Sequence, residues 1–214
     1  MDWSAVDSII FDMDGTLWDA TESYSKIWNA CSEKAGIKAR ITPQELKKYM
    51  GMTLDNIFRN VHTVAKDFDV KKYLSMLEQA EDEMMPSLGG EPYPGMRECI
   101  KELSAVYKLF MVSNCGKKGL ENFMTWTGTS EFFTNSLTFG GTSKNKSENI
   151  KTLITKYNLK SPVYMGDTQG DCDQTHLAGI PFVFARYGFG TCKGYDLAFD
   201  SIEDFTKYFL KLKD

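Results

Sequence analysis

The stretch Ser8-Ile-Ile-Phe-Asp-Met-Asp-Gly-Thr16 decides the fold that this sequence predicts. Its first four residues form a short apolar run, and turn residues follow, among them Asp12 and Asp14. An apolar run that ends in turn residues is typical of a buried strand followed by a loop. In an open α/β sheet, ligands bind at the carboxyl ends of the strands. The two aspartates are therefore predicted to lie at a ligand site.

From Tyr93 onward the sequence alternates between helical and strand patterns. Apolar runs predict strands at 108–112, 136–139, 163–165 and 182–184, and helical spacing predicts helices at 94–103, around 120–124, at 150–157 and at 172–178. This alternation indicates a parallel sheet with helices on both faces. We therefore predict an α/β fold with a Rossmann-like core.

Residues from about 19 to 85 show helical patterns alone. Apolar stripes recur at helical spacing in four segments, and Thr42-Pro-Gln-Glu45 has the form of a capping box. Four helices with short loops fit a small bundle. The sequence thus predicts a core of residues 1–18 and 87–214, and an inserted four-helix cap of residues 19–86. Gly89-Gly90, in the second connection, is expected to act as a hinge for a lid.

Composition excludes several classes of protein. The chain has 214 residues, 42% of them hydrophobic and 25% charged, and a net charge of −4. These values exclude disordered, collagen-like and disulfide-rich chains, and without a basic excess we expect no nucleic-acid partner. No apolar run approaches the ~18 residues of a membrane span, so no membrane partner is expected. Five scattered cysteines favour free thiols in the cytoplasm, and we expect a monomer or a weak dimer.

Polar residues gather at the predicted strand ends. They are Asp12, Asp14, Ser113, Asn114, Asp167 and Asp171. Four converging carboxylates repel one another and need a cation, and ligands that are all oxygen suit Mg²⁺. Ser113, the backbone N–H groups that follow it and Lys146 could hold a phosphate group. Together these groups predict phosphoryl transfer, in which a carboxylate can act as the nucleophile.

Four motifs in order resemble those of the haloacid dehalogenase-like hydrolase superfamily. They are Asp12-Met-Asp-Gly-Thr-Leu17, Val112-Ser-Asn114, Lys146 and Gly166-Asp-Thr-Gln-Gly-Asp171. The insertion between the first two motifs resembles the helical cap of the phosphoglycolate phosphatase-like and β-phosphoglucomutase-like branch. The resemblance covers essentially the whole chain and implies the α/β core with a cap.

The resemblance also implies a role for each site residue. Asp12 would attack phosphorus, and Asp14 would protonate the leaving oxygen and then activate water. Ser113, Asn114 and Lys146 would bind the phosphoryl oxygens. Mg²⁺ would be bound by Asp12, Asp14 (through its backbone carbonyl), Asp167 and Asp171. The implied activity is that of a Mg²⁺-dependent phosphatase, a phosphoric monoester hydrolase acting on a small phosphorylated metabolite through an aspartyl-phosphate.

Several alternatives stay open from the sequence. A sugar-phosphate mutase of the same architecture would carry a histidine where this chain has Tyr24, and a non-catalytic binding protein could use the same fold. Lys144 competes with Lys146 for the site, and Asp171 could serve only as a helix cap. Cys115 has no evident catalytic partner, so we interpret it as part of an anion-binding loop. The candidate specificity residues are Thr53, Asn56 and Arg59, and the substrates left open include phosphoglycolate, pyrophosphate, sugar phosphates and nucleoside monophosphates.

Overall fold

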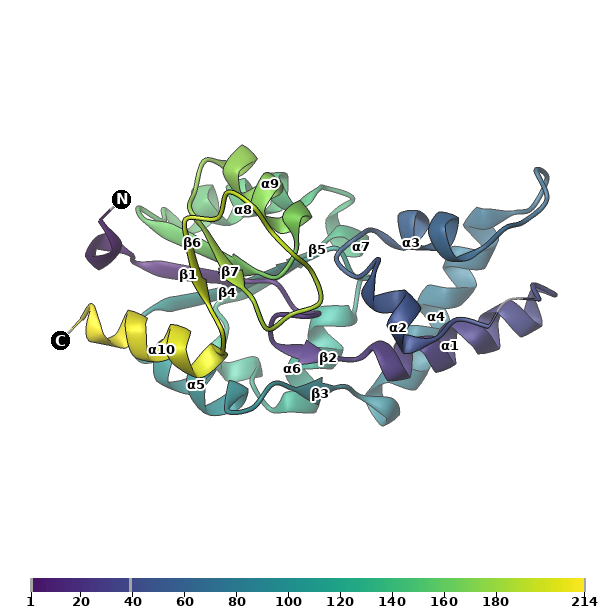
Figure 1. The fold of residues 1–214 in the computed structure, drawn as a ribbon, viewed down its shortest axis with the longest axis horizontal. Helices are drawn as coiled ribbons and strands as arrows, with labels where there is room; N and C mark the ends of the chain where they lie inside the picture. Colours follow the sequence, from purple (N-terminus) through teal and green to yellow (C-terminus); the bar gives the residue numbers. More distant parts are fainter. Residues whose placement is uncertain (1, 39, 214) are drawn as a thin grey trace.

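A six-stranded parallel sheet forms the centre of the protein (Figure 1). The computed structural model describes residues 2–38 and 40–213; of the predicted domain ranges, only residues 1, 39 and 214 lie outside the described residues. The strand order is β5-β4-β1-β6-β7-β8. Their bounds are β1 (Ser8–Phe11), β4 (Lys108–Ser113), β5 (Asn135–Thr138), β6 (Pro162–Gly166), β7 (Phe182–Ala185) and β8 (Leu197–Phe199). The predicted fold class is confirmed.

Side-chain alternation along β1 explains why helices cover both faces of the sheet. Ile9 and Phe11 belong to one apolar cluster and Ile10 to another, because successive residues of a strand point to opposite faces. The first cluster packs against α5 (Met96–Ser104), α6 (Gly119–Thr127) and α10 (Ile202–Lys211). The second packs against α8 (Lys146–Tyr157) and α9 (Gln169–Ala178). β1 is therefore buried on both sides, as its apolar run predicts.

The segment between β1 and β4 holds four helices, which we call the insertion helices. They are α1 (Thr21–Lys34), α2 (Pro43–Lys47), α3 (Leu54–Val61) and α4 (Val70–Leu88). The capping box of Thr42 and Glu45 is present at α2. α1 packs against α2 and α4, and α3 packs against α4, beyond the carboxyl edge of the sheet on the right of Figure 1. The insertion joins the core through a short antiparallel pair, β2 (Trp18–Asp19) with β3 (Glu91–Pro92).

Close packing favours glycine at positions 89 and 90, and the backbone conformation at position 89 also favours it. Gly89 ends α4 with φ 59°, and a Cβ atom there would overlap the Trp126 ring. A Cβ atom at Gly90 would lie 2.6 Å from the Trp18 ring, and the Trp126 indole N–H donates to the Gly90 carbonyl at 3.0 Å. The hinge expected here stays a prediction; in this structure the two glycines let two indoles pack tightly against the chain.

The sequence patterns predict no element beyond residue 184, and the structure has two in the described residues there, β8 and α10. β8 has only three residues, too few to show a period, and it exists because it pairs with β7. α10 lays Ile202, Phe205 and Phe209 into the core. α7 (Phe139–Thr142) is a further short helix after β5. Among the helices described, none combines the length and the apolarity needed to cross a membrane.

Candidate active site

The predicted site residues meet at the carboxyl edge of the sheet. Asp12 directly follows the central strand β1, Ser113 ends β4, and Asp167 directly follows β6. Lys146 begins α8, and Asp171 lies in the first turn of α9. All five side chains are buried. Residues up to 159 positions apart in sequence thus form one polar site, because parallel strands end at the same edge of a sheet.

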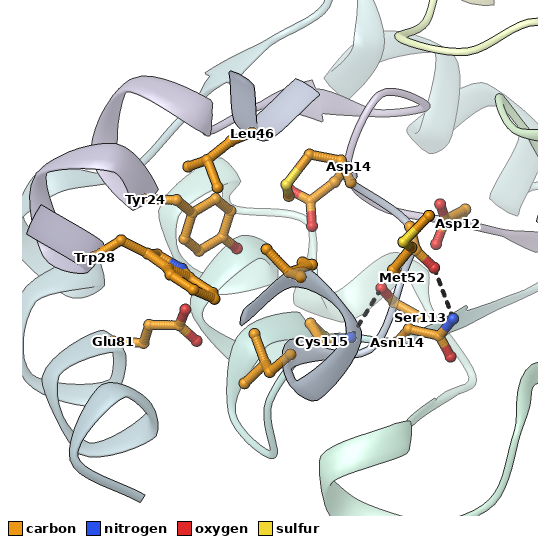
Figure 2. A pocket seen from close by; sticks show the side chains of 14 residues that line it. Asp12, Asp14, Tyr24, Trp28, Leu46, Met52, Glu81, Ser113, Asn114 and Cys115 are labelled. Atoms are coloured by element: carbon orange, nitrogen blue, oxygen red, sulfur yellow. Dashed lines mark hydrogen bonds between the residues drawn. The ribbon is translucent and has the colours of Figure 1, made fainter. Parts of the chain in front are cut away.

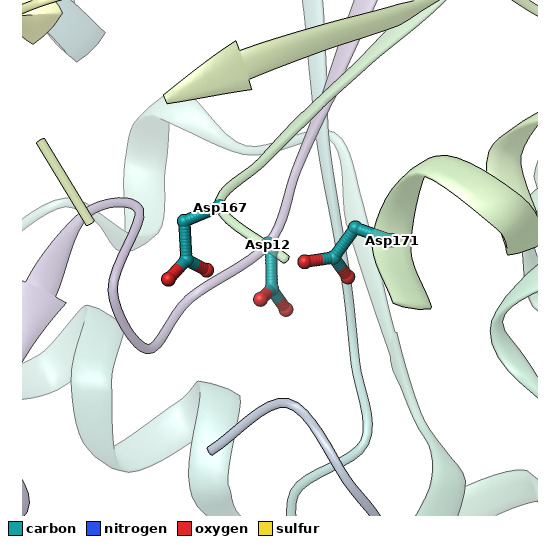
Figure 3. Close-up of side chains that lie close together, drawn as sticks. All are labelled: Asp12, Asp167 and Asp171. Carbon is teal, nitrogen blue, oxygen red and sulfur yellow. The ribbon is translucent and has the colours of Figure 1, made fainter. Parts of the chain in front are cut away.

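Asp12, Asp167 and Asp171 form a carboxylate cluster (Figure 3). One oxygen from each lies within 4.8 Å of the others. Burial, together with the charge of Asp171, raises the pKa of Asp12 to about 6, and the same causes raise the pKa of Asp167 well above its ordinary value. Asp12 Oδ2 has no hydrogen-bond partner among the described residues. An all-oxygen donor set under mutual repulsion, with a free oxygen, fits a hard divalent cation such as Mg²⁺.

Two neighbours hold the Asp167 carboxylate in place. The backbone N–H of Phe189 donates to Asp167 Oδ2 at 2.8 Å, and the Thr16 hydroxyl lies 3.4 Å from Oδ1. Gly188 packs so closely against Asp167 that a side chain there would overlap it. Phe189 and Gly188 are not among the site residues predicted from the sequence. A glycine pair, Gly188 and Gly190, placed just after the predicted strand at 182–184, is the signal that could have found this loop.

Asp171 has two partners, one for each oxygen. Its Oδ2 accepts hydrogen bonds from the Thr168 backbone N–H at 3.0 Å and hydroxyl at 2.6 Å, in a capping box that begins α9. Its Oδ1 contacts the Lys146 ammonium. The capping role and the site role that the sequence left open are therefore compatible.

Lys146 carries the positive charge of the site. Its Nζ lies 2.8 Å from Asp12 Oδ1, and both side chains are buried. Burial alone would lower the pKa of Lys146, but the charges of Asp12 and Asp171 outweigh it and raise that pKa well above the ordinary range. Lys144, the alternative candidate, is exposed. The structure thus brings Lys146, not Lys144, to the carboxylate cluster.

Asp14 stands beside the carboxylate cluster but is not part of it. Its Oδ1 accepts a hydrogen bond from the Trp18 indole N–H at 2.9 Å, and Asp14 lines the cavity described below. Burial and the charge of Asp12 raise the pKa of Asp14 to about 8. A carboxyl in this state can donate a proton near neutral pH. Of the four predicted metal ligands, Asp14 is the one whose side chain lies outside the cluster.

The loop after β4 differs in part from its prediction. The Asn114 side chain, predicted to bind phosphate, donates instead to the Gly51 carbonyl of the insertion at 2.7 Å. The loop after α2 reaches over the sheet edge, so this amide is already occupied. Burial holds the pKa of Cys115 well above its ordinary range, and a protonated thiol is a poor nucleophile. This agrees with our interpretation of Cys115.

A cavity separates the sheet edge from the insertion helices (Figure 2). From the core it is lined by Asp12, Asp14 and residues 113–115, and from the insertion by Tyr24, Trp28, Leu46, residues 50–52, Leu54, Ile57 and Glu81. Its volume is about 30 Å³, above the roughly 10–15 Å³ that a cavity needs to hold one water molecule. The space between the sheet edge and the insertion helices is therefore small in this arrangement.

The specificity candidates Thr53, Asn56 and Arg59 do not line this cavity. Helix α3 turns Leu54 and Ile57 inward, and this leaves Asn56 and Arg59 exposed on its outer side. The Arg59 guanidinium instead pairs with Asp55 at 2.8 Å. The structure therefore does not bring these three candidates to the cavity, because the polar positions of an amphipathic helix face away from what it covers.

Glu81 also lines the cavity and is not among the site residues predicted from the sequence. It lies in α4 on the buried stripe of Tyr73, Leu77 and Met85, where every fourth residue faces inward. A glutamate in an apolar stripe is a readable signal, since charged residues are rarely buried without a partner. Burial, then the charges of Asp14, Glu78 and Asp82, raise the pKa of Glu81 to about 8.

The raised pKa of Glu81 makes stability depend on pH. The folded state holds the proton more tightly than the unfolded state, so this contribution is complete below pH 4.5 and is lost as pH rises through about 8. Between pH 5 and pH 9 we expect wild type to lose about 4 kcal/mol of its free energy of unfolding through Glu81. Glu81→Gln should not show this loss, so its stability relative to wild type should rise by the same amount. Urea titrations at both pH values measure it.

The exposed Glu83 of the same helix supplies the control variant, Glu83→Gln. The groups near Glu81 that could also titrate are Asp14, Tyr24, Cys31, Tyr73, Glu78, Asp82 and Cys115. An equal gain for both variants would show that Glu81 is not the group responsible.

A family model, a sequence relative and solved structures are all similar to this chain. The model of the family described as haloacid dehalogenase-like hydrolase matches residues 9–185. A Rhodobacter capsulatus protein called phosphoglycolate phosphatase is 23% identical over 193 residues, which are 85% of each chain. A solved structure described as a predicted phosphoglycolate phosphatase, from Haemophilus somnus, superposes with a TM-score of 0.82 at 21% identity, covering 95% of this chain and 98% of that one. A haloacid dehalogenase-like family protein from Streptococcus pneumoniae gives 0.83 at 18% identity, covering 96% and 99%.

Proposed function

Since this chain belongs to the haloacid dehalogenase-like hydrolase family, we propose that it is a Mg²⁺-dependent phosphatase that hydrolyses a small phosphorylated metabolite through an aspartyl-phosphate. The observation that carries this proposal is the Asp12 carboxylate. It lies at the end of the central strand, with one oxygen beside Lys146 and the other without a hydrogen bond in the described chain. An unpaired carboxylate oxygen that lines a cavity can act as a nucleophile.

The proposed reaction has two steps. In the first, an Asp12 oxygen forms a bond to phosphorus, the bond between phosphorus and the ester oxygen breaks, and Asp14 gives its proton to the leaving alcohol. In the second, Asp14 takes a proton from water, the water oxygen attacks phosphorus, and the Asp12 carboxylate is released with inorganic phosphate. Positioned acid–base catalysis of this kind contributes about 10²–10⁴-fold.

The other polar residues would bind the transferring group. Lys146, fixed between Asp12 and Asp171, would offset the charge of the phosphoryl oxygens, and the Ser113 hydroxyl at the end of β4 would donate to one of them. Asp12, Asp167, Asp171 and the Asp14 backbone carbonyl would hold Mg²⁺. The bound metal would supply charge stabilisation for the equatorial oxygens.

Residues 19–86 would act as the cap of this site. The cavity of about 30 Å³ and the hydrogen bond from Asn114 to Gly51 describe a closed arrangement. Opening would admit the ester, and closing would exclude bulk water while the aspartyl-phosphate forms. Lys47 of the insertion also reaches the core, where its ammonium lies 5.3 Å from the Phe189 ring centre. Both contacts would have to break during each turnover.

The direct test is an assay of inorganic phosphate release over a panel of phosphate esters with Mg²⁺. The same samples are tested for interconversion of sugar phosphates. Phosphate release supports the phosphatase, interconversion without release supports the mutase, and neither product supports a binding protein. The purified Asp12→Asn variant is the blank for contaminating phosphatase.

Metal binding has its own prediction. Adding Mg²⁺ at 100 times its dissociation constant to metal-free protein is expected to raise the free energy of unfolding by about 2.7 kcal/mol, since the unfolded chain lacks the site. Thermal unfolding with and without Mg²⁺ measures this, and excess chelator is expected to stop phosphate release. The Asp167→Asn variant should lose the thermal shift. Full phosphate release in excess chelator would contradict the proposed metal dependence.

A further inference from the structure

We propose that Glu81 selects phosphate esters whose alcohol carries an ammonium group, so that the substrates are the O-phosphates of small amino alcohols. This inference rests on the proposed phosphatase function and identifies the class of its leaving group. It comes from the chemistry of the cavity on the side away from the carboxylate cluster.

The position of Glu81 suits contact with the leaving group. In Figure 2, Asp12 and Ser113 lie on one side of the cavity, Trp28 and Glu81 on the other, and Asp14 between them. A phosphoryl group at Asp12 would therefore direct its ester oxygen toward Asp14 and the rest of the alcohol toward Glu81. A short alcohol would reach the insertion helices directly.

The charges that line the cavity argue against an anionic alcohol. Among the described residues that line it, none is lysine, arginine or histidine, whereas Asp12, Asp14 and Glu81 all carry carboxyl groups. The carboxylate of phosphoglycolate would be buried near Glu81 without a positive partner. An unpaired buried anion is strongly unfavourable, as would be a second phosphate group in the same place. The cavity lining therefore does not favour phosphoglycolate, which appears in the name of the Rhodobacter relative, as the substrate of this chain.

The same lining suits a cation. Trp28 and Tyr24 line the cavity beside Glu81, and aromatic faces attract ammonium groups. Glu81 is 9% exposed and forms no ion pair with any described residue. Burial raises the pKa of Glu81 to about 8, so the empty cavity holds it protonated at neutral pH. An entering ammonium group would favour release of that proton and make a charge-assisted hydrogen bond with the resulting carboxylate.

A second hollow extends the acidic character beyond Glu81. It has a volume of about 250 Å³ and shares Tyr24 and Glu81 with the first cavity. Its lining adds Glu78 and Asp82 and a single base, Lys117, among the described residues, and Asp82 pairs with Lys118 at 3.2 Å. An excess of acidic groups around an opening attracts cations and repels anions. Both hollows therefore favour the same charge on the substrate.

The experiment compares three esters of nearly equal length: phosphoethanolamine, 2-phosphoglycolate and ethyl phosphate. Their alcohols are cationic, anionic and neutral in turn, so differences in kcat/KM report the charge preference. We expect wild-type kcat/KM for phosphoethanolamine to exceed that for each of the other two by about 100-fold. In Glu81→Gln, which keeps the size of the side chain, the ratio of phosphoethanolamine to ethyl phosphate should fall by about 100-fold.

Glu83→Gln is the matched control, because Glu83 lies on the same helix, is exposed and lines neither hollow. Circular dichroism and a cooperative urea transition check that Glu81→Gln is folded. A wild-type preference for 2-phosphoglycolate or ethyl phosphate, or an unchanged ratio in Glu81→Gln, would overturn the proposal. p-Nitrophenyl phosphate is included as a general phosphatase substrate. Phosphate release from it and from none of the three small esters would overturn the charge preference but support the proposed phosphatase function. Release from no ester would reject the proposed function, and this inference with it.

Discussion

Replacing Asp12 with asparagine is expected to lower kcat by at least about 10⁴-fold. The amide has nearly the same shape as the carboxylate, but its nitrogen and oxygen are poor nucleophiles toward phosphorus, so the covalent step is lost. The loss should exceed that of any residue that only positions the substrate. Single-turnover and steady-state phosphate release, measured on the same preparation, separate loss of chemistry from loss of binding.

Asp173→Asn is the matched control for this variant. Asp173 lies on α9, two residues from Asp171, but it is exposed and accepts a hydrogen bond only from the Gln169 side chain within the described chain. Its replacement should leave kcat within about twofold of wild type, because surface substitutions away from a site have small effects. Near-native turnover by a pure Asp12→Asn preparation would show that Asp12 is not the nucleophile.

Replacing Lys146 with methionine should affect both stability and activity. Methionine keeps much of the length and apolar volume but removes the ammonium that lies between Asp12 and Asp171. The remaining buried carboxylates then lack their positive partner in metal-free protein. Removing one partner of a buried pair costs about 3–5 kcal/mol in free energy of unfolding. We expect a loss of that size, and a fall in kcat/KM of at least about 10²-fold from the lost contact with the phosphoryl group.

Lys144→Met is the matched control for Lys146→Met, because Lys144 is exposed and lies only two residues from Lys146. Urea unfolding in chelator should show a change below about 0.5 kcal/mol for this control. If the two methionine variants unfold at the same urea concentration, the ion pairs of Lys146 contribute nothing measurable. If they differ in stability but not in kcat/KM, Lys146 is structural and does not bind the phosphoryl group.

Local patterns in the sequence determined most of the architecture. The apolar run at 8–11 and the later alternation predicted the parallel sheet with its two helical layers, and four apolar stripes predicted the insertion helices. These predictions held because strand and helix periods are local properties, readable over about 4 to 18 residues. The order of the four motifs likewise placed Asp12, Lys146 and Asp167 at one edge, since strand ends meet there in any parallel sheet.

Tertiary structure alone decided which neighbours complete the site. The Asn114 amide bonds the Gly51 carbonyl across 63 positions, and the Phe189 backbone reaches Asp167 from a separate loop. Glu81 meets Asp14 and Trp28 only because α4 packs against α1 over the sheet edge. No local period encodes such contacts, because they depend on how loops and helices distant in sequence pack together. The sequence by itself thus determined that Asp12 directly follows the central strand at the edge of the sheet, and the packing of the insertion helices decided which side chains line the cavity beside it.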